Sequence, residues 1–328
     1  MPPTGVVRTV LGDVPASALG RVDYHEHLFQ VSPLLPGDEL DDAGRSEQEA
    51  GALHASGFDA MVDATPVGLG RDPAAVAAIS ARTGLTVVAT TGAHRPAHYP
   101  GVSWLLEASE DGLTERFRRD VVVGMPAADG AAPGEPARAP DGAPVRAGVL
   151  KAGVDYWRIE PFSRRVLAAV ARVHGETGVP VMVHLEHGSA AFEVLELLVG
   201  EGVTADAIAL AHVDRNPDPG LHAELAAAGA YLGYDGPARH ASWPDSVVLE
   251  CLLATAARGG RDRLLLGGDV ARATRYAAYG GMPGLAYLGR RFVPRLRAEG
   301  GVDLADAVLV GNPARWLGRI SITTPEAT

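Results

Sequence analysis

The feature that most constrains this 328-residue chain is a regular succession of short β-type segments separated by stretches of helical character. Most of these segments are continuous apolar runs, as expected for strands that are covered on both faces. Helix-like segments at 72–84, 164–178 and 190–202 lie between them, and the last two end in Gly, a common helix stop. The eight β-type segments span residues 21–27, 59–65, 85–92, 147–153, 180–186, 207–213, 229–236 and 263–270.

Eight β-then-α units in a chain of this length predict an α/β fold of the (β/α)8 TIM-barrel type. We expect a single domain over residues 1–320, with a Pro/Ala/Gly-rich loop at 124–146 and a tail at 321–328. A doubly wound open sheet is the alternative. No G-x-G-x-x-G follows a strand and no phosphate-binding P-loop occurs, which disfavours an open nucleotide-binding sheet.

Charge and cysteine content narrow the class of protein. The formal net charge of −11 argues against nucleic acid or an anionic membrane as a partner. No apolar run approaches the roughly 20 residues that a membrane-spanning helix needs. The single cysteine, Cys251, excludes an internal disulfide and fits a reducing, cytoplasmic setting. We therefore expect a cytoplasmic protein that acts on a small-molecule substrate, and we leave a homodimer open.

Lysine usage singles out one position. The chain contains 29 Lys and Arg residues together, and Lys151 is its one lysine. A genomic bias toward Ala, Gly, Arg and Pro accounts for part of this scarcity. An arginine side chain does not lose its proton in a protein, whereas a lysine can. Lys151 is therefore a candidate for chemistry that arginine cannot perform.

Polar side chains stand at the ends of five of the eight β-type segments. Two residues apart in a strand, His25 and His27 point to the same face. In a (β/α)8 barrel the carboxyl ends of the strands meet at one mouth. Imidazole and carboxylate groups are the usual ligands of Zn²⁺ and similar ions, so the pattern predicts a metal site. Its candidate residues are His25, His27, Lys151, His184, His212 and Asp269.

Single members of this set could also have purely structural roles. His184 alone would fit a core histidine, and Asp269 alone would fit a helix cap. Neither explains why the polar residues stand at the same end of successive strands. Lys151 could instead form a Schiff base in an aldolase barrel, but that leaves four histidines unexplained. A metal-binding protein without catalytic activity is a third class.

These motifs together resemble the phosphotriesterase family of the amidohydrolase superfamily. The resemblance rests on HEH at 25–27, Lys151, His184, AHVDRNPD at 211–218 and GGD at 267–269, and it covers nearly the whole chain. It implies a metal-dependent hydrolase in which CO2 carboxylates Lys151, and the carbamate bridges two divalent metal ions, usually zinc, with Mn or Co as alternatives. The resemblance assigns His25, His27 and Asp269 to a buried metal, and His184 and His212 to an exposed one.

The same resemblance implies a reaction. A hydroxide that bridges the metals attacks an ester carbonyl or phosphoryl centre, and Asp269 takes its proton. The loops at 229–246 and 268–285 look most like the sugar-lactonase branch, which predicts a sugar lactone, phosphorylated or acidic, as substrate. Phosphotriester or aryl ester hydrolysis is the alternative. Ala241, Ser242 and Ala273 stand where that branch would place lysine, tyrosine and lysine, which weakens the case for a phosphorylated substrate.

Substrate contacts are predicted on three loops. The strand-seven and strand-eight loops carry most of the basic and tyrosine side chains, and the loop after the third strand adds two more candidates. The roles of Asp63, Glu186 and His187 stay open, although Asp63 could orient a ligand histidine through a hydrogen bond. The predicted contact residues are His94, Tyr99, Arg239, Arg272, Arg275, Tyr276 and Tyr279.

Overall fold

A computed structural model describes residues 5–132 and 134–319, so the predicted tail at 321–328 lies outside the described residues. Eight parallel strands neighbour one another in chain order, from β3 to β10. The backbone N–H of Asp269 donates to the carbonyl of His25 at 2.9 Å, which joins the two ends of the sheet. The predicted TIM barrel is therefore confirmed. Its strands are β3 Val22–Glu26, β4 Ala60–Asp63, β5 Thr86–Gly92, β6 Val149–Val154, β7 Val181–Leu185, β8 Ile208–Ala211, β9 Tyr231–Tyr234 and β10 Leu264–Leu266.

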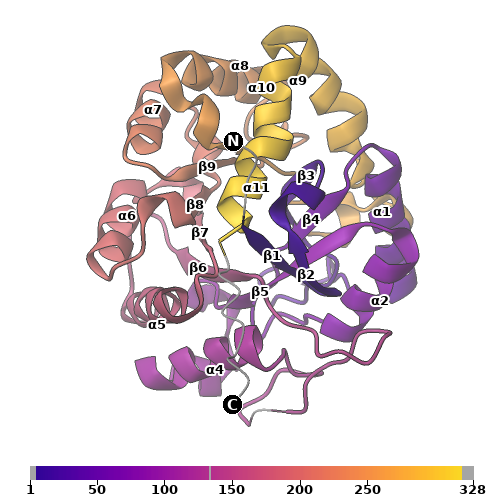
Figure 1. The fold of residues 1–328 in the computed structure, drawn as a ribbon, viewed down its shortest axis with the longest axis vertical. Coiled ribbons are helices and arrows are strands. Elements are labelled where there is room, and N and C mark those ends of the chain that lie inside the picture. The colour runs from indigo at the N-terminus through magenta and orange to yellow at the C-terminus, as the bar shows by residue number, and fades with distance from the viewer. Residues whose placement is uncertain (1–4, 133, 320–328) are drawn as a thin grey trace.

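Helices form a ring around these strands (Figure 1). Asp72 caps the N-terminus of α2 by accepting the backbone N–H of Ala75, and Gly84 ends this helix in the left-handed conformation. Helix α5 begins three residues before the predicted segment, at Pro161, which suits the first turn of a helix. The helices are α1 Ala43–Ala55, α2 Pro73–Thr83, α3 Ser103–Leu106, α4 Glu110–Val122, α5 Pro161–Thr177, α6 Ala191–Gly200, α7 Pro219–Ala227, α8 Asp245–Thr255, α9 Val293–Gly300, α10 Val302–Asp306 and α11 Asn312–Leu317.

The barrel interior changes character along the strands. Val149 of β6 and Met182 of β7 belong to an apolar cluster that fills its lower part. Side chains two residues apart in a strand share a face, so Lys151 and His184 stand above these two residues. The same alternation that builds the core therefore delivers polar groups to the mouth.

A hairpin and the last helix close the opposite end. Strands β1 Val6–Thr9 and β2 Gly12–Pro15 pair in antiparallel fashion and lie with α11 over the centre of the view in Figure 1. Val7 and Trp316 pack into the interior cluster, and Trp316 donates its indole N–H to the carbonyl of Ala207 at 3.2 Å. We name this end the floor of the barrel.

The segment predicted as a loop, 124–146, has no helix or strand among its described residues, but ion pairs fasten it to the barrel. Asp129 lies 2.9 Å from Arg71 and 2.6 Å from Arg116, and it accepts the backbone N–H of Gly68 at 2.8 Å. Arg71 is itself buried. The segment is therefore held against α4 and the loop that precedes α2.

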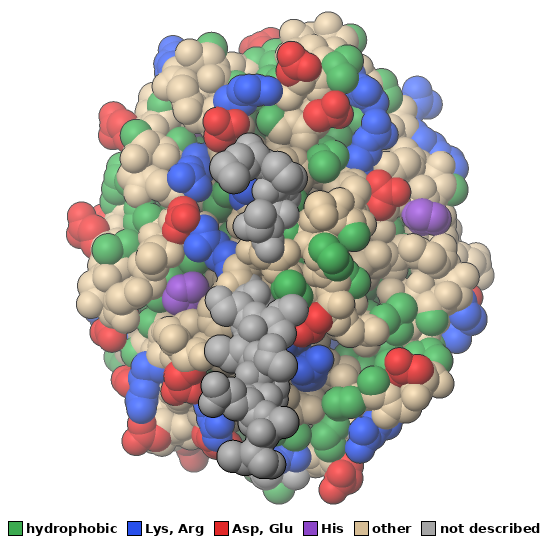
Figure 2. All heavy atoms as spheres, in the orientation of Figure 1, with side chains coloured by type: hydrophobic (Ala, Val, Ile, Leu, Met, Phe, Trp, Pro, Cys, Tyr) green, Lys and Arg blue, Asp and Glu red, His purple; other side chains and the backbone are tan. Residues whose placement is uncertain are grey.

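Surface charge and helix hydropathy can be compared with the expectations from sequence. On the face drawn in Figure 2, acidic and basic side chains are interspersed with hydrophobic ones rather than gathered by sign. Of the helices in the described ranges, none has both the length and the hydropathy needed to cross a bilayer.

Candidate metal centre

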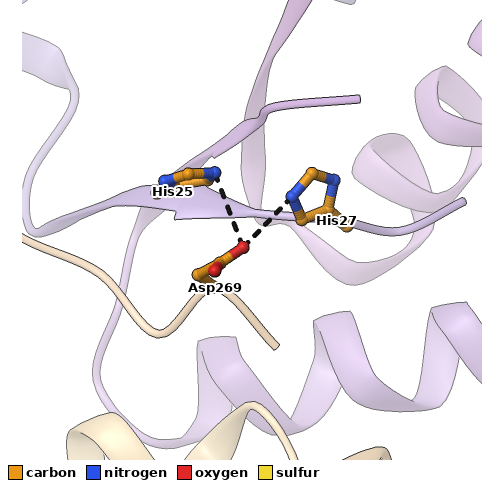
Figure 3. Close-up of side chains that lie close together, drawn as sticks. All are labelled: His25, His27 and Asp269. Atoms are coloured by element: carbon orange, nitrogen blue, oxygen red, sulfur yellow. Dashed lines mark ion pairs between the residues drawn. The ribbon is translucent and has the colours of Figure 1, made fainter. Parts of the chain in front are cut away.

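His25 of β3 and His27, directly after this strand, converge on one carboxylate. Nε2 of His25 and Nε2 of His27 lie 3.6 and 3.4 Å from Oδ1 of Asp269 (Figure 3). The register of β3 against β4 shifts between Asp23 and Glu26. The regular pairing of this strand is therefore interrupted next to the two histidines. Asp269 has a positive φ of 44°, which is unusual for a residue other than glycine and is typical of functional sites. These three groups can hold one metal ion.

Lys151 joins this cluster from β6. Its Nζ lies 3.1 Å from Nε2 of His25, and the side chain is buried. Among the described residues, no carboxylate oxygen lies within ion-pair distance of Nζ. Burial lowers the pKa of Lys151 to about 8. The lone lysine thus faces the imidazole of His25 from inside the barrel.

Two further histidines complete the mouth. The ring centroids of His184 and His212 are 4.5 Å apart, and those of His25 and His212 are 5.1 Å apart. His212 has a positive φ of 67°, so its backbone is also strained. The structure therefore brings together all six residues predicted from the strand ends, although their binding of metal remains a prediction.

A buried carboxylate that the sequence analysis missed orients two of these rings. Asp235 lies directly after β9 and is fully buried. Its Oδ2 accepts from Nδ1 of His25 at 3.2 Å, its Oδ1 accepts from Nδ1 of His212 at 2.5 Å, and it also accepts the hydroxyl of Tyr24. Nε2 of His25 then faces Lys151 and Asp269. A carboxylate behind a histidine in this way is the usual support of a metal ligand.

The other two histidines are anchored by different groups. Oγ1 of Thr65 donates to the carbonyl of Phe29 at 2.7 Å and therefore accepts from Nδ1 of His27 at 2.8 Å. Nε2 of His184 lies 2.8 Å from Oε2 of Glu186, which leaves its Nδ1 free. Each of the four histidines thus has one nitrogen tied to the protein and one available to a metal. This donor set fits divalent cations.

The protonation states suit metal binding. Burial, and then the charge of Lys151, lowers the pKa of His25 to about 3. Burial likewise lowers the pKa of His184 and His212. Burial alone would raise the pKa of Asp269, but the Arg239 guanidinium and neighbouring imidazoles hold it well below its usual value. Neutral imidazoles and an ionised carboxylate are the forms that bind metals.

A cavity of about 570 Å³ opens above these residues. His94, Arg239, Arg272 and Arg275 line it, so four of the predicted contact residues face the space that a substrate would occupy. Arg239 forms an ion pair with Asp269, and Arg215 reaches Oδ2 of Asp269 at 3.2 Å. We name Arg215, Arg239, Arg272 and Arg275 the arginine wall.

Three predicted contact residues, all tyrosines, do not line this cavity. Tyr276 is buried and donates its hydroxyl to the carbonyl of His27. Tyr99 is buried and accepts the backbone N–H of His94 at 2.7 Å. The hydroxyl of Tyr279 accepts the backbone N–H of Asp42 at 2.8 Å, beside α1. Each phenol hydroxyl already has a backbone partner, so these tyrosines support the loops, and their contact with a substrate stays a prediction.

The residues left open by the sequence also find places. Oδ1 of Asp63 accepts the backbone N–H of Thr65 at 3.2 Å, so it supports His27 through Thr65 and not by a direct hydrogen bond. Glu186 anchors His184, whereas His187 is exposed at the rim. Asp235 could have been suspected from sequence because, like Asp269, it is an acidic residue that follows a barrel strand.

A parallel barrel whose mouth gathers four anchored imidazoles, a buried lysine and an ionised carboxylate is the architecture of a metal-dependent hydrolase. The phosphotriesterase family model matches residues 5–317, and the chain therefore belongs to the phosphotriesterase family. It is an enzyme that hydrolyses ester bonds.

Named relatives are consistent with this assignment. The chain is 30% identical to a phospho-furanose lactonase of Mycoplasmopsis agalactiae, over 95% of this chain and 91% of that protein. It is 27% identical to an N-acetyltaurine hydrolase of Danio rerio, over 95% of this chain and 98% of that protein. A crystal structure of a lactonase from Listeria monocytogenes superposes with a TM-score of 0.84 at 31% identity, over 96% of this chain and all of that one.

Proposed function

We propose that this protein is a binuclear metal-dependent lactonase that opens sugar lactones carrying an anionic group. The observation that carries the proposal is the arrangement of four histidines, each anchored through one ring nitrogen, around Lys151 and Asp269. Structural histidines do not need a second nitrogen aimed at a shared cavity. Two metal ions are the simplest occupant of so many converging donors.

His25, His27 and Asp269 would hold the inner ion, and His184 and His212 the outer one. Zn²⁺ suits this set of imidazole and carboxylate ligands, with Mn²⁺ or Co²⁺ as alternatives. Lys151 would bridge both ions as a carbamate. The neutral amine adds to the carbon of CO2, a C–N bond forms, and one proton leaves the nitrogen. This turns a cation that would repel metals into an anion with two donor oxygens.

When bound, the metals would polarise the scissile carbonyl and lower the pKa of water toward neutrality. The protein contributes the proton acceptor. Oδ1 of Asp269 faces His25 and His27, whereas Oδ2 faces Arg215 and Arg239 at the cavity. Asp269 is therefore placed to accept the proton of the attacking water and to pass it to the alkoxide of the opened ring.

The charge distribution of the cavity selects the substrate. Arg275 stands in the arginine wall with its buried Nη2 lacking a hydrogen-bond partner in the described residues, and its Nη1 lies 3.4 Å from the carbonyl of Asp269. Across the cavity, the ion pairs of Arg95 with Asp155 and Glu186 balance its charge. The arginine wall therefore gives one side of the cavity a positive charge that suits a phosphate or carboxylate. The phosphate of the Mycoplasmopsis enzyme's named substrate class supports the same preference.

A lactone panel tests the proposal. The protein would be reconstituted with Zn²⁺ or Mn²⁺ and bicarbonate, then assayed with furanose lactones that are matched except for a phosphate, a carboxylate or a neutral hydroxyl. We expect turnover of lactones, with kcat/KM higher for the anionic members. Turnover confined to an aryl phosphotriester or an aryl ester would instead support the alternative activity. No turnover of any ester by protein with two bound metals would refute the proposal.

The proposal also includes the cellular setting and the oligomeric state of the protein. Cys251 is buried and unpaired, which suits a reducing, cytoplasmic setting. The site is complete within one chain, so a homodimer is compatible with it but is not required for chemistry.

A further inference from the structure

A second hollow adjoins the cavity above the candidate metal centre, which we name the metal cavity. The proposed chemistry does not use this second hollow. Its volume is about 590 Å³. It shares Arg95, Glu186, His187 and Arg215 with the metal cavity and extends outward to Tyr156 and Trp157. We name it the distal pocket. The shared residues make it an extension of the reaction site.

Exposed aromatic side chains gather at this end of the molecule. Within residues 5–132 and 134–319, the exposed tyrosine and tryptophan side chains are Tyr156, Trp157 and Trp243. Trp157 is 64% exposed and Tyr156 is 59% exposed, and both line the distal pocket, while Trp243 lines the metal cavity. Large aromatic rings left in water at a pocket are typical of ligand contacts rather than of core packing.

The chain holds Trp157 in place at a conformational cost. Its φ is 50°, a left-handed conformation that bulky residues rarely adopt. Asp155 and Arg158 exchange backbone hydrogen bonds of 3.1 Å across this turn, and the backbone N–H of Trp157 donates to Oγ of Ser189 at 3.0 Å. These bonds hold the backbone of the turn from which the indole ring reaches the distal pocket. Across the pocket, His187 has a φ of 54° and its ring meets that of Tyr156 edge to face, at 5.7 Å.

The polar groups of the distal pocket differ from those of the arginine wall. Nη1 of Arg95 lies 3.2 Å from Asp155, and Nη2 lies 3.2 Å from Glu186, so this guanidinium is shared by two carboxylates and leaves no excess of positive charge. The carboxylates and the side-chain amide of Asn216 remain to exchange hydrogen bonds with ligand hydroxyls, whereas Oγ of Ser189 is already bonded to backbone atoms. A neutral ring that carries hydroxyls on its edge and C–H groups on its face matches this combination.

We propose that the distal pocket binds a second sugar ring, attached to the lactone ring that is opened at the metal centre. This inference rests on the proposed lactonase function and adds that glycosylated aldonolactones belong to the substrate class. The ring would stack on Trp157, and its hydroxyls would meet the chain of ion pairs that runs from Asp155 through Arg95 to Glu186. Glu186 also anchors His184, so occupancy of the distal pocket would steady a metal ligand.

Kinetics on paired substrates tests the proposal. Maltobionolactone carries a second glucose ring, and gluconolactone lacks it. We expect the wild-type protein to favour the disaccharide lactone in kcat/KM by about three- to tenfold, the range of an aromatic stacking contact. Trp157→Ala should bring this ratio to about one, and Trp157→Phe should restore most of it. Val302→Ala, which shortens an exposed apolar side chain that lines neither cavity, is the control and should leave the ratio as in wild type.

A binding measurement separates this inference from the lactonase assignment. Calorimetric titration with maltobionate and with gluconate, the ring-opened acids, needs no turnover. Tighter binding of maltobionate that Trp157→Ala abolishes would support the distal pocket even if no lactone were hydrolysed. Equal affinities together with equal kcat/KM values would overturn it. A loss of dimer in Trp157→Ala by sedimentation would also overturn it, because Trp157 would then be covered by a second copy.

Discussion

The two ends of this barrel are made from the same eight strands, yet they are built for different purposes. At the floor, Val7 and Trp316 pack in an apolar cluster with relaxed backbone. At the mouth, the next inward positions carry ionisable groups, and His212 and Asp269 adopt left-handed backbone conformations. Two residues along each strand therefore separate two layers of the barrel. The apolar layer at the floor stabilises the fold, whereas the ionisable layer at the mouth lowers stability and carries the chemistry.

The largest effect should come from a substitution at the mouth that keeps the positive charge of the metal-free protein but removes the chemistry of Lys151. Lys151→Arg retains a basic side chain but cannot form a carbamate. We expect both metals to be lost and kcat/KM to fall by about a thousandfold or more, because activation of water depends on the metals. Metal content by atomic emission and lactone hydrolysis are the measurements.

Exposed Arg291→Lys is the control for that exchange, because it alters an arginine far from any proposed ligand. It should retain metal and activity. Full metal content in Lys151→Arg would contradict the carbamate assignment. Covalent trapping of a carbonyl substrate at Lys151 by borohydride would support the aldolase alternative instead.

The second change acts on the floor and should leave the chemistry intact. Trp316 is fully buried, so Trp316→Ala removes a large apolar side chain and its hydrogen bond to Ala207. We expect the free energy of unfolding to fall by about 3–5 kcal/mol. Urea denaturation measures this loss, and kcat/KM per bound metal should stay near the wild-type value at temperatures where the variant is folded.

Trp243→Ala is the matched comparison, since that ring is exposed and its loss should change the free energy of unfolding by less than about 1 kcal/mol. A large drop in metal affinity for Trp316→Ala would show that floor and mouth are energetically coupled. The division between the two layers would then be wrong.

Much of this organisation could be predicted from sequence. The eight strands lie within the predicted segments or one residue beyond them, because strands buried on both faces are continuous apolar runs. Converging strand ends then brought His25 and Asp269 together, although they are far apart in the chain. These predictions depend on patterns that are local in sequence and on one rule of barrel topology.

Other features depend on packing that no local pattern encodes. The tyrosines at 99, 276 and 279 look like substrate contacts because phenols suit that role, but each hydroxyl found a backbone partner instead. The hairpin of the floor is too short to give a periodic signal. Asp235 was missed because its role depends on the orientation of two imidazoles from distant strands.

Asp235 lies within the mouth but would touch no metal, so its replacement should have the smallest effect of the three. One carboxylate accepts from Nδ1 of both His25 and His212. Asp235→Asn keeps the size of the side chain but replaces one acceptor oxygen with a donor, so at most one ring stays anchored. We expect metal affinity, or kcat/KM at limiting metal, to fall about 10- to 100-fold, as for other groups that orient metal ligands.

The control for Asp235→Asn is a second buried carboxylate that supports no histidine of the site. Asp245 accepts from the hydroxyl of Tyr287 at 2.7 Å and from the backbone N–H of Ala238 at 2.8 Å. Asp245→Asn should therefore cost stability without a comparable loss of metal affinity. If both variants weakened metal binding equally, the effect would come from general loosening of the mouth. If only Asp235→Asn does so, and excess metal restores its kcat, the two rings are held for the metals by this one carboxylate.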